Sequence, residues 1–424
     1  MVPVCLLPER IHGNAARVVV QHFPVPPETR SIDPAVDGRA RRIVETLRGL
    51  DDETIENELE TLLADFENRH REVRQYFENR YEAIARDLDL PTPARNAERA
   101  LIGAYFCHEY SFQAAALMNP SVVLHPDQSG LGPDEIRFLM SLRAVGEGHI
   151  SSITFRQGVL SADGAMRLHP ESRLAVAASP EIGADGHLRL RRQDGGPIEE
   201  TVLFPVTQAH RGGLEDLRLV KFDDGDDSCY CGTYTAWSGR EIASELLVTR
   251  DFRSFELRPI SGCAARDKGM ALFPRRIGGD YAMIVRQDAE NLYFIRSDDL
   301  SCWSEGEKIA GPMHTWELVQ IGNCAPPVEL DEGWLLLTHG VGAMRKYCIG
   351  AMLLDKDNPA RVLARSRTPL LSPSDVGREG YVPNVVYTCG ALRHGDYMFM
   401  PFGVADCIVG FAMVRLDHFL ETLV

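Results

Sequence analysis

The sequence predicts a mainly β protein, a five-bladed β-propeller preceded by an extended arm and an α-helical extension. From residue 119 onward, short runs of Val, Ile, Leu, Phe and Tyr are broken by Gly, Asp and Pro, which is typical of short strands joined by turns. Before that point, apolar residues recur at three- and four-residue intervals, which is typical of helices that pack by one face. We therefore expect an arm with helices over residues 1–117 and a propeller over residues 118–424.

The first 40 residues are expected to form an extended arm, because four prolines between residues 24 and 34 exclude a long helix. The helical pattern covers residues 40–88 and returns over residues 94–117. A solvated helical hairpin would account for the many charged side chains. The alternative is that the apolar stripes pack on a neighbouring subunit or on the propeller, which predicts a homo-oligomer assembled through these helices.

A loose repeat within residues 118–424 favours the propeller. In each unit a strand ends on a polar or aromatic residue, and a second strand runs into an Asp-containing turn. Tyr234 and Arg286 are 52 residues apart, Arg286 and His339 are 53 apart, and the longer step from Arg143 to Tyr234 leaves room for an insertion. Five such units suit a propeller whose inner strands line a central cavity. A pair of packed β-sheets is the alternative.

The composition excludes two classes of partner. The chain has 61 acidic and 45 basic residues, a formal net charge of −16, and no basic stretch to offset repulsion from nucleic acid or an anionic membrane. No secretory signal pattern and no stretch long enough to span a bilayer is found. Ten cysteines without Cys-x-x-Cys spacing predict buried thiols in a reducing cytoplasm, with neither disulfides nor a metal site.

Two adjacent carboxylates are the centre of the predicted site. Glu215 and Asp216 follow a glycine turn and precede Arg218. On an extended segment successive side chains point to opposite sides, so one carboxylate can face a cavity while the other is held from behind. Arg218 would share the face of Asp216 and hold a carboxylate through a bidentate pair. A solvated turn with a surface salt bridge is the alternative.

Polar side chains near the predicted strand ends and turns would join this site. They are Arg143, Tyr234, Arg286, His339, Asp216 and Asp406. Sugar-binding sites need such a mixture, because charged groups hydrogen-bond hydroxyls and aromatic faces cover the apolar side of the ring. Three of these residues have structural alternatives: His339 in a core, Arg286 in an ion pair between blades, and Asp406 in an ordinary turn.

Six stretches carry a family resemblance. They are Gly213–Arg218 (GLEDLR), Lys268–Pro274 (KGMALFP), Ile321–Pro327 (IGNCAPP), Gly333–Val341 (GWLLLTHGV), Glu379–Val386 (EGYVPNVV) and Gly403–Asp406 (GVAD). In these stretches the chain resembles glycoside hydrolase family 130, the β-mannoside phosphorylases and mannosidases. The resemblance runs in the family's order from residue 119 to the carboxyl end, and the residues before it lie outside. The family has a five-bladed propeller fold, in agreement with the repeat.

By this resemblance Asp216 is the general acid, although Leu217 stands where the family usually has proline. The resemblance implies that phosphate is bound by Lys268, Arg286, His339 and Tyr347, and the substrate by Asn119, Arg143, Glu215, Arg218, Tyr234, Glu379 and Asp406. Lys268 stands near where an arginine is often found, and Gln320 stands where a lysine is common. No metal and no cofactor is implied, and inorganic phosphate is a co-substrate.

The expected reaction is the inverting phosphorolysis of a β-mannoside, such as a mannobiose, a mannooligosaccharide or a mannosyl-glucose. It would give α-mannose 1-phosphate and a shortened sugar. Phosphate arrives already ionised, so a phosphorylase needs one enzymic carboxyl group, whereas an inverting hydrolase must activate water with a second one. Glu379 is the candidate for that base in the alternative, an inverting β-mannosidase. A sugar-binding propeller without turnover is the alternative from another class.

Overall fold

The computed structural model describes residues 4–23, 38–90, 95–225 and 227–424. The chain divides into two compact units, of which the first comprises residues 1–15, 112–171 and 178–424 and the second residues 16–111 and 172–177. The four prolines that predict an extended arm lie outside the described residues. Each unit is described by itself below.

The second unit is mainly helical. Its elements are β2 (Val19–His22), α1 (Gly38–Arg48), α2 (Asp52–Phe66), α3 (Val73–Asp87), α4 (Asn96–Ala104), β3 (Cys107–Tyr110) and β8 (Val176–Ala177). The helices predicted within residues 40–88 are confirmed, whereas the helix predicted over residues 94–117 ends at Ala104. The chain leaves the helical conformation there because β3 pairs with β2, so a tertiary contact overrides the local pattern.

The helices of this unit pack around apolar cores, one of which includes residues of all four helices. Val44, Ile55, Ile84 and Leu101, one from each helix, are buried there. Helices α3 and α4 come close at Gly103, where a Cβ atom would lie 1.9 Å from the carbonyl oxygen of Phe77. The absence of a Cβ atom at Gly103 therefore allows these two helices to approach closely. Among the described residues, no helix is both long enough and apolar enough to cross a bilayer.

The first unit contains the large sheets, and the predicted mainly β character is confirmed. The largest sheet has the order β4 (Ala116–Leu124), β5 (Glu135–Val145), β6 (Ser151–Ser161), β12 (Gly213–Asp224), β13 (Asp227–Trp237), β14 (Ile242–Thr249), β15 (Ser254–Pro259), β10 (Leu188–Arg191), β9 (Ser179–Ile182), with β7 (Met166–Leu168) and β11 (Thr201–Leu203) on β6. Its neighbours are antiparallel except at one place, where Gly213 of β12 pairs in parallel with Ser151 of β6. This single contact joins two otherwise separate groups of strands.

Three smaller sheets complete this unit. The first is β16 (Ala271–Leu272), β17 (Tyr281–Val285), β18 (Leu292–Ser297), β19 (Glu307–Ala310). The second is β20 (Gln320–Asn323), β22 (Trp334–Val341), β23 (Tyr347–Leu354), β24 (Val362–Arg365), with β21 (Val328–Glu329) on β22. The third is β1 (Val4–Leu6), β28 (Ile408–Arg415), β27 (Tyr397–Val404), β25 (Val386–Tyr387), with β26 (Leu392–His394) on β27. The helices are α5 (Pro373–Val376) and α6 (Leu416–Leu420), and 3₁₀ turns cover Glu147–His149, Ile198–Glu200 and Ala343–Arg345.

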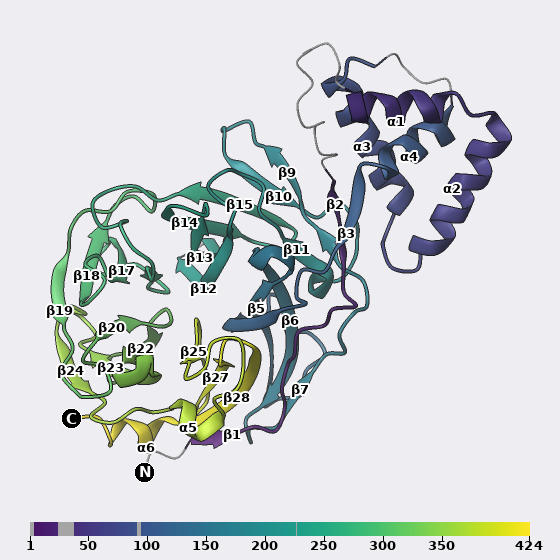
Figure 1. Cartoon of the computed structure of the whole chain (residues 1–424). Coiled ribbons are helices and arrows are strands. Elements are labelled where there is room, and N and C mark those ends of the chain that lie inside the picture. Colours follow the sequence, from purple (N-terminus) through teal and green to yellow (C-terminus); the bar gives the residue numbers. More distant parts are fainter. Residues whose placement is uncertain (1–3, 24–37, 91–94, 226) are drawn as a thin grey trace. The chain divides into compact units, whose positions relative to one another are not determined.

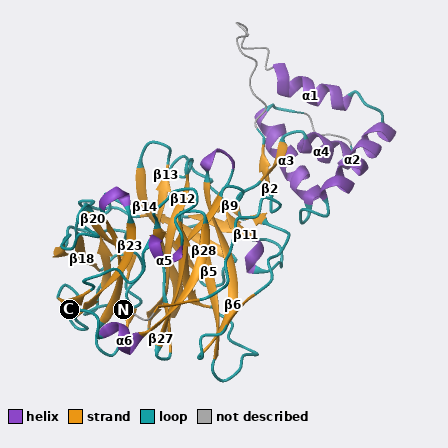
Figure 2. Ribbon diagram, turned by 60° about the horizontal axis from the view of Figure 1, so that its bottom comes forward, coloured by secondary structure: helices purple, strands orange, loops and turns teal. Residues whose placement is uncertain are grey.

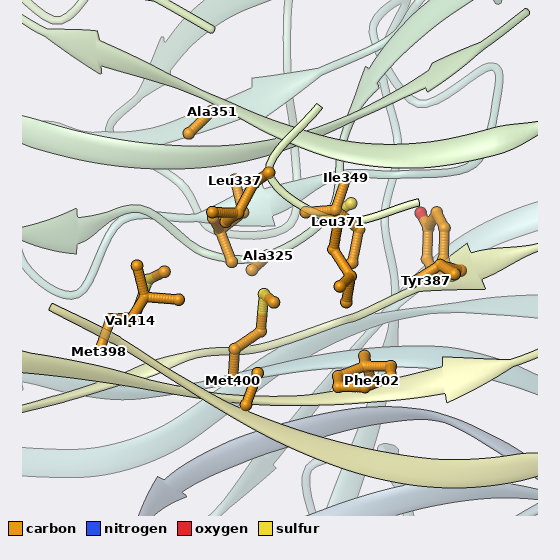
Figure 3. Packing of buried hydrophobic residues seen from close by; sticks show 14 of the residues in the cluster. Ala325, Leu337, Ile349, Ala351, Leu371, Tyr387, Met398, Met400, Phe402 and Val414 are labelled. Atoms are coloured by element: carbon orange, nitrogen blue, oxygen red, sulfur yellow. The ribbon is translucent and has the colours of Figure 1, made fainter. Parts of the chain in front are cut away.

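The sheets of the first unit lie around a common centre, with β12, β20 and β25 on the inner side (Figure 1). Figure 2, coloured by secondary structure, shows that strands make up most of this unit. Neighbouring sheets share apolar cores, and Figure 3 shows one of them. Met398, Met400 and Phe402 alternate along β27, so they share a face and pack against Leu337 and Ile349 of the preceding sheet. These cores hold the strands rigidly and leave their ends to form the site.

Candidate active site

One cavity of about 180 Å³ collects most of the residues singled out in the sequence. Its lining is Asn119, Arg143, Asp216, Arg218, Lys268, Gly269, Arg286, Asn323, His339, Arg345, Tyr347, Val385, Tyr387 and Asp406. They come from strands or turns of all four large sheets of the first unit, so the site depends on the whole sheet assembly.

Asp216 reaches the cavity through a β-bulge. The pairing of β12 with β13 shifts between Glu215 and Arg218, and Asp216 has φ 54°, in the left-handed region. A second bulge in β4 gives Asn119 a φ of 49°. A non-glycine residue held in this region costs on the order of 1–3 kcal/mol, and such strain is common at functional sites. The two bulges bring Asn119 Nδ2 to 2.7 Å from Asp216 Oδ1.

The two adjacent carboxylates have different surroundings. Asp216 lines the cavity and accepts a hydrogen bond from Arg143 Nη1 at 3.2 Å. Glu215 is buried outside the lining and is held by Arg143 Nη2 and Lys268 Nζ, each at 2.7 Å. The prediction that one carboxylate faces a cavity while the other is held from behind is confirmed. The surface salt bridge is the alternative that fails.

The pKa of Asp216 follows from these contacts. Burial would raise this pKa, but the charges of Arg143, Arg218 and Lys268 prevail and lower it to about 2. Asp216 is therefore a carboxylate at neutral pH in the unliganded protein. A role as general acid would require Asp216 to gain a proton first.

Arg218 does not make the predicted bidentate pair with a carboxylate. Its Nη1 donates to the main-chain oxygen of Asp216 at 3.0 Å, its Nε to the main-chain oxygen of Cys324 at 3.0 Å, and its Nη2 to the Tyr387 hydroxyl at 2.8 Å. The bulge turns the Asp216 side chain away, so the assumption of a regular strand was wrong at this point. Arg218, in the cavity wall, instead links β12, β25 and the residue that follows β20.

The residues predicted to bind phosphate lie together. Arg286 Nη1 is 3.4 Å from His339 Nε2, and Arg286 Nη2 is 3.2 Å from Asp267 Oδ2. The rings of His339 and Tyr347 stack with centroids 5.9 Å apart, and Lys268 lines the same cavity. This side of the cavity carries the positive charges of Arg286 and Lys268, and Arg345, whose guanidinium lies 6.0 Å from the centre of the Tyr347 ring, adds a third.

His339 contributes no positive charge at neutral pH. Burial, followed by the charges of Arg286 and Arg218, holds its pKa well below the usual value. Because a guanidinium can only donate, His339 Nε2 accepts from Arg286 and the neutral ring carries its hydrogen on Nδ1. His339 is thus a neutral ring in the cavity wall.

Asp406 is the second carboxylate of the cavity lining. It lies in the turn between β27 and β28, where Ala405 and Asp406 have φ 50° and 48°. Burial, followed by the charge of Asp216, raises the pKa of Asp406 to about 6. The two carboxyl groups of the cavity therefore differ widely in acidity, although both are aspartates.

Two predicted site residues are not in the cavity lining. Tyr234 is buried in the core beside β14, and its hydroxyl donates to Glu245, which also contacts His210. Tyr234 lies on β13, the second strand from the centre, and its ring is buried in an apolar core. The Glu379 side chain is exposed in the loop after α5. Neither residue therefore touches the space where Asp216 lies.

The sequence analysis missed three polar residues of the lining, Asn323, Arg345 and Tyr387. Asn323 and Tyr387 stand in or next to the stretches that carry the family resemblance, so the motifs held a signal for them. Arg345 lies on an exposed turn in which Met344 and Arg345 both have positive φ, and no sequence pattern marks it.

Comparison with known proteins gives a consistent family. The model of a family described as beta-1,4-mannooligosaccharide phosphorylase matches residues 196–424. A 1,2-beta-oligomannan phosphorylase of Thermoanaerobacter sp. is 32% identical over 52% of this chain and 74% of its own length. A beta-1,2-mannobiose phosphorylase of the same organism is 35% identical over 52% of this chain and 72% of its own length.

Solved structures extend the likeness beyond the matched sequence. The beta-1,2-mannobiose phosphorylase of Listeria innocua aligns with a TM-score of 0.51 at 21% identity, over 73% of this chain and 92% of its own. A structure from work on family members that are hydrolases of beta-1,2 mannosidic linkages in Candida mannan aligns with a TM-score of 0.54 at 18% identity, over 73% of this chain and 87% of its own. At identities this low, the matches to solved structures show similarity of fold only. From the sequence matches, the chain belongs to glycoside hydrolase family 130.

Proposed function

We propose that the protein is an inverting phosphorylase that cleaves a β-mannoside with inorganic phosphate, giving α-mannose 1-phosphate and a shortened sugar. The observation that carries this proposal is a single cavity lined by Asp216 together with Arg286, Lys268 and the neutral ring of His339. Phosphate is a dianion that such side chains bind well. The relatives named as oligomannan and mannobiose phosphorylases support the same reaction.

The propeller belongs to this proposal. If the largest sheet is divided at the single parallel contact between Gly213 and Ser151, the first unit has five groups of antiparallel strands. Five such groups around a centre are what a five-bladed propeller requires. The proposed propeller domain covers residues 118–424, and β1, which pairs with β28, would be added to its last blade.

The proposed mechanism assigns the proton transfer to Asp216. An oxygen of HPO₄²⁻ attacks the anomeric carbon from one face, the bond from that carbon to the leaving oxygen breaks, and Asp216 gives its proton to the leaving oxygen. The hydrogen of HPO₄²⁻ restores the proton on Asp216, directly or through a substrate hydroxyl, so protons balance over one turnover. A phosphate bound near Arg286 and Lys268 adds negative charge close to Asp216 and so raises its pKa toward the range of an acid.

The remaining polar side chains hold the substrates. Asn119, Arg143 and Asp406 are placed to bind the mannosyl ring, and Tyr347 borders the phosphate side. Glu215 acts from behind by fixing Arg143 and Lys268. Glu379, the candidate base for activating water in a hydrolase, is exposed and outside the lining, so it is not placed for that role.

The test is incubation with β-1,2-, β-1,3- and β-1,4-linked mannosides, each with and without phosphate. Mannose 1-phosphate that forms only with phosphate would support the proposal. Free mannose at the same rate regardless of phosphate would support an inverting β-mannosidase. Binding without any product would support a sugar-binding protein that does not turn over.

The raised pKa of Asp406 predicts an effect of Asp406→Asn on stability. A carboxyl group whose folded pKa lies above its unfolded value stabilises the fold below the unfolded pKa, near 4, and loses that contribution as pH rises through about 6. Asp406→Asn should therefore raise the thermal midpoint at pH 7–8 and have a smaller effect at pH 4. Mannoside affinity should fall in the variant. A midpoint difference that does not vary with pH would contradict the assignment.

We further propose a homo-oligomer that uses the helical unit. Phe23 and Tyr105 are 42% and 50% exposed, and the main-chain N–H of Phe23 bonds to the carbonyl of Phe106, so the two apolar side chains come from adjoining segments. An apolar surface of this kind suits a second copy of the chain. Light scattering should give a multiple of the chain mass at micromolar concentration, and Tyr105→Glu should lower it while Tyr105→Phe should not. A monomeric parent would contradict the proposal.

A cytoplasmic location is also proposed. All ten cysteines are free, including Cys229 and Cys231, whose sulfur atoms are 3.4 Å apart without a bond. Free neighbouring thiols fit a reducing compartment.

A further inference from the structure

Asn323, at the end of β20, has an unusual environment. Its side chain lines the cavity and is 1% exposed. Among the described residues, neither its Oδ1 nor its Nδ2 has a hydrogen-bond partner. Buried side-chain amides are nearly always hydrogen-bonded, because an unpaired polar group loses its contacts with water without any replacement. An amide left unpaired at the wall of a cavity therefore points to a ligand.

The position of Asn323 is set by close packing of β20 on β22. Gly322 pairs with His339, and a Cβ atom at Gly322 would lie 2.4 Å from His339 Cε1 and 3.2 Å from Arg286 Cδ. On the other side, a Cβ atom at Gly269 would lie 3.7 Å from Asn323 Oδ1. Asn323 thus lies between the Lys268–Gly269 segment and the Arg286–His339 pair, which are the two parts of the proposed phosphate site.

A neighbouring donor is also unpaired. Among the described residues, Arg286 Nε is buried and has no hydrogen-bond partner. With Asn323 Nδ2 it makes two free donors, and Asn323 Oδ1 adds one free acceptor. A ligand that satisfies this set must offer acceptor oxygens and at least one hydrogen. The hydrogen phosphate ion, HPO₄²⁻, has both.

We infer that Asn323 binds the hydrogen phosphate co-substrate at two points, with Nδ2 donating to a phosphate oxygen and Oδ1 accepting from the phosphate hydroxyl. This inference rests on the proposed function and deepens it by naming a residue that selects among anions. Sulfate has the same shape and charge but carries no hydrogen at neutral pH, so Asn323 Oδ1 would face a sulfate oxygen without a hydrogen between them. The site therefore prefers HPO₄²⁻, and its analogue HAsO₄²⁻, over sulfate.

The test compares Asn323→Leu, which removes both polar atoms at similar size, with Asn323→Asp, which keeps an acceptor and adds a negative charge. The matched control is Gln113→Leu, because Gln113 is another fully buried amide with unpaired side-chain atoms and lies outside the cavity lining. Initial rates are measured against phosphate and against mannoside, with sulfate as inhibitor. Thermal midpoints are measured with and without phosphate.

We expect Asn323→Leu to raise KM for phosphate about ten- to a hundredfold, with KM for the mannoside changed by about twofold or less. The inhibition constant of sulfate should change less than KM for phosphate, so discrimination between the two anions shrinks. Asn323→Asp should weaken both anions through charge repulsion. Without phosphate, the midpoint of Asn323→Leu should equal or exceed that of the parent, because an unpaired amide is removed. Gln113→Leu should keep the parent's kinetic constants.

Three results would overturn the inference. If the parent uses phosphate but Asn323→Leu keeps its KM for phosphate, Asn323 is not a ligand and the proposed function stands. If Asn323→Leu lowers the midpoint without phosphate and lowers kcat with KM unchanged, the role of Asn323 is structural. If the parent's rate is the same at all phosphate concentrations, the proposed function fails and the inference fails with it.

Discussion

Replacement of Asp216 by asparagine should lower kcat by about 10²- to 10⁴-fold and leave the fold intact. The amide keeps the size of the side chain and an oxygen that can accept from Asn119 Nδ2 and Arg143 Nη1, but it cannot transfer a proton. Initial rates at saturating phosphate and mannoside, with the thermal midpoint as a check on folding, give the measurement. We expect KM values to change much less than kcat.

Glu215→Gln is the matched control for this experiment. Glu215 bonds Arg143 and Lys268 and does not line the cavity, so its loss should weaken binding through those two side chains. Activity of Asp216→Asn within a few-fold of the parent would move the acid elsewhere. Glu215 would then be the next candidate.

Arg286→Ala should raise KM for phosphate about ten- to a hundredfold, because it removes a charge-assisted contact of about 1.5–3 kcal/mol. The effect should be large because His339 is neutral, which leaves Lys268 as the other cation predicted to bind phosphate. Mannoside binding should change far less, since in the proposed mechanism Arg286 would face the attacking side of the sugar. Rates against phosphate, with mannoside saturating, provide the measurement.

Two variants sharpen this experiment. Arg276→Ala removes an arginine that lies over the Tyr281 ring, pairs with Asp224 and is not in the cavity lining, so its KM for phosphate should match the parent. Glu379→Gln should have little effect in a phosphorylase, because the side chain is exposed. A Glu379→Gln variant as damaged as Asp216→Asn, together with a rate independent of phosphate, would show a hydrolase instead.

The sequence was sufficient for the β character of residues 118–424 and for most of the cavity lining. Apolar residues that recur at a regular interval indicate which face of an element is buried. This pattern predicted the strands and the helices within residues 40–88. The repeat and the family resemblance together named nine of the residues that line the cavity, among them Arg143, His339 and Asp406. Such residues are recognisable because a charged side chain next to a buried apolar strand usually needs a partner or a ligand.

The errors have a common physical cause, which is local departure from regular backbone. The bulge at Asp216 turns its side chain away from Arg218. The alternation of side chains along a regular strand does not predict such a bulge. Tyr234 was placed in the cavity from its spacing, but strand order within a sheet decides which strand is inner. Asn323 was missed because the feature that marks it, a buried amide without a hydrogen-bond partner, is visible only in the structure.

The pairing of β1 with β28 bears on how the protein is made. Val4 lies opposite Val414, so segments about 400 residues apart form one edge of a sheet. At synthesis rates of about 5–20 residues per second, β1 leaves the ribosome on the order of 20–80 s before its partner. During that interval the last sheet cannot be completed, and the Asp406 turn, which precedes β28, is still missing from the cavity. The helices of residues 38–104 have already emerged by then, so we infer that a nascent chain carries a folded helical unit while its catalytic cavity is still unformed.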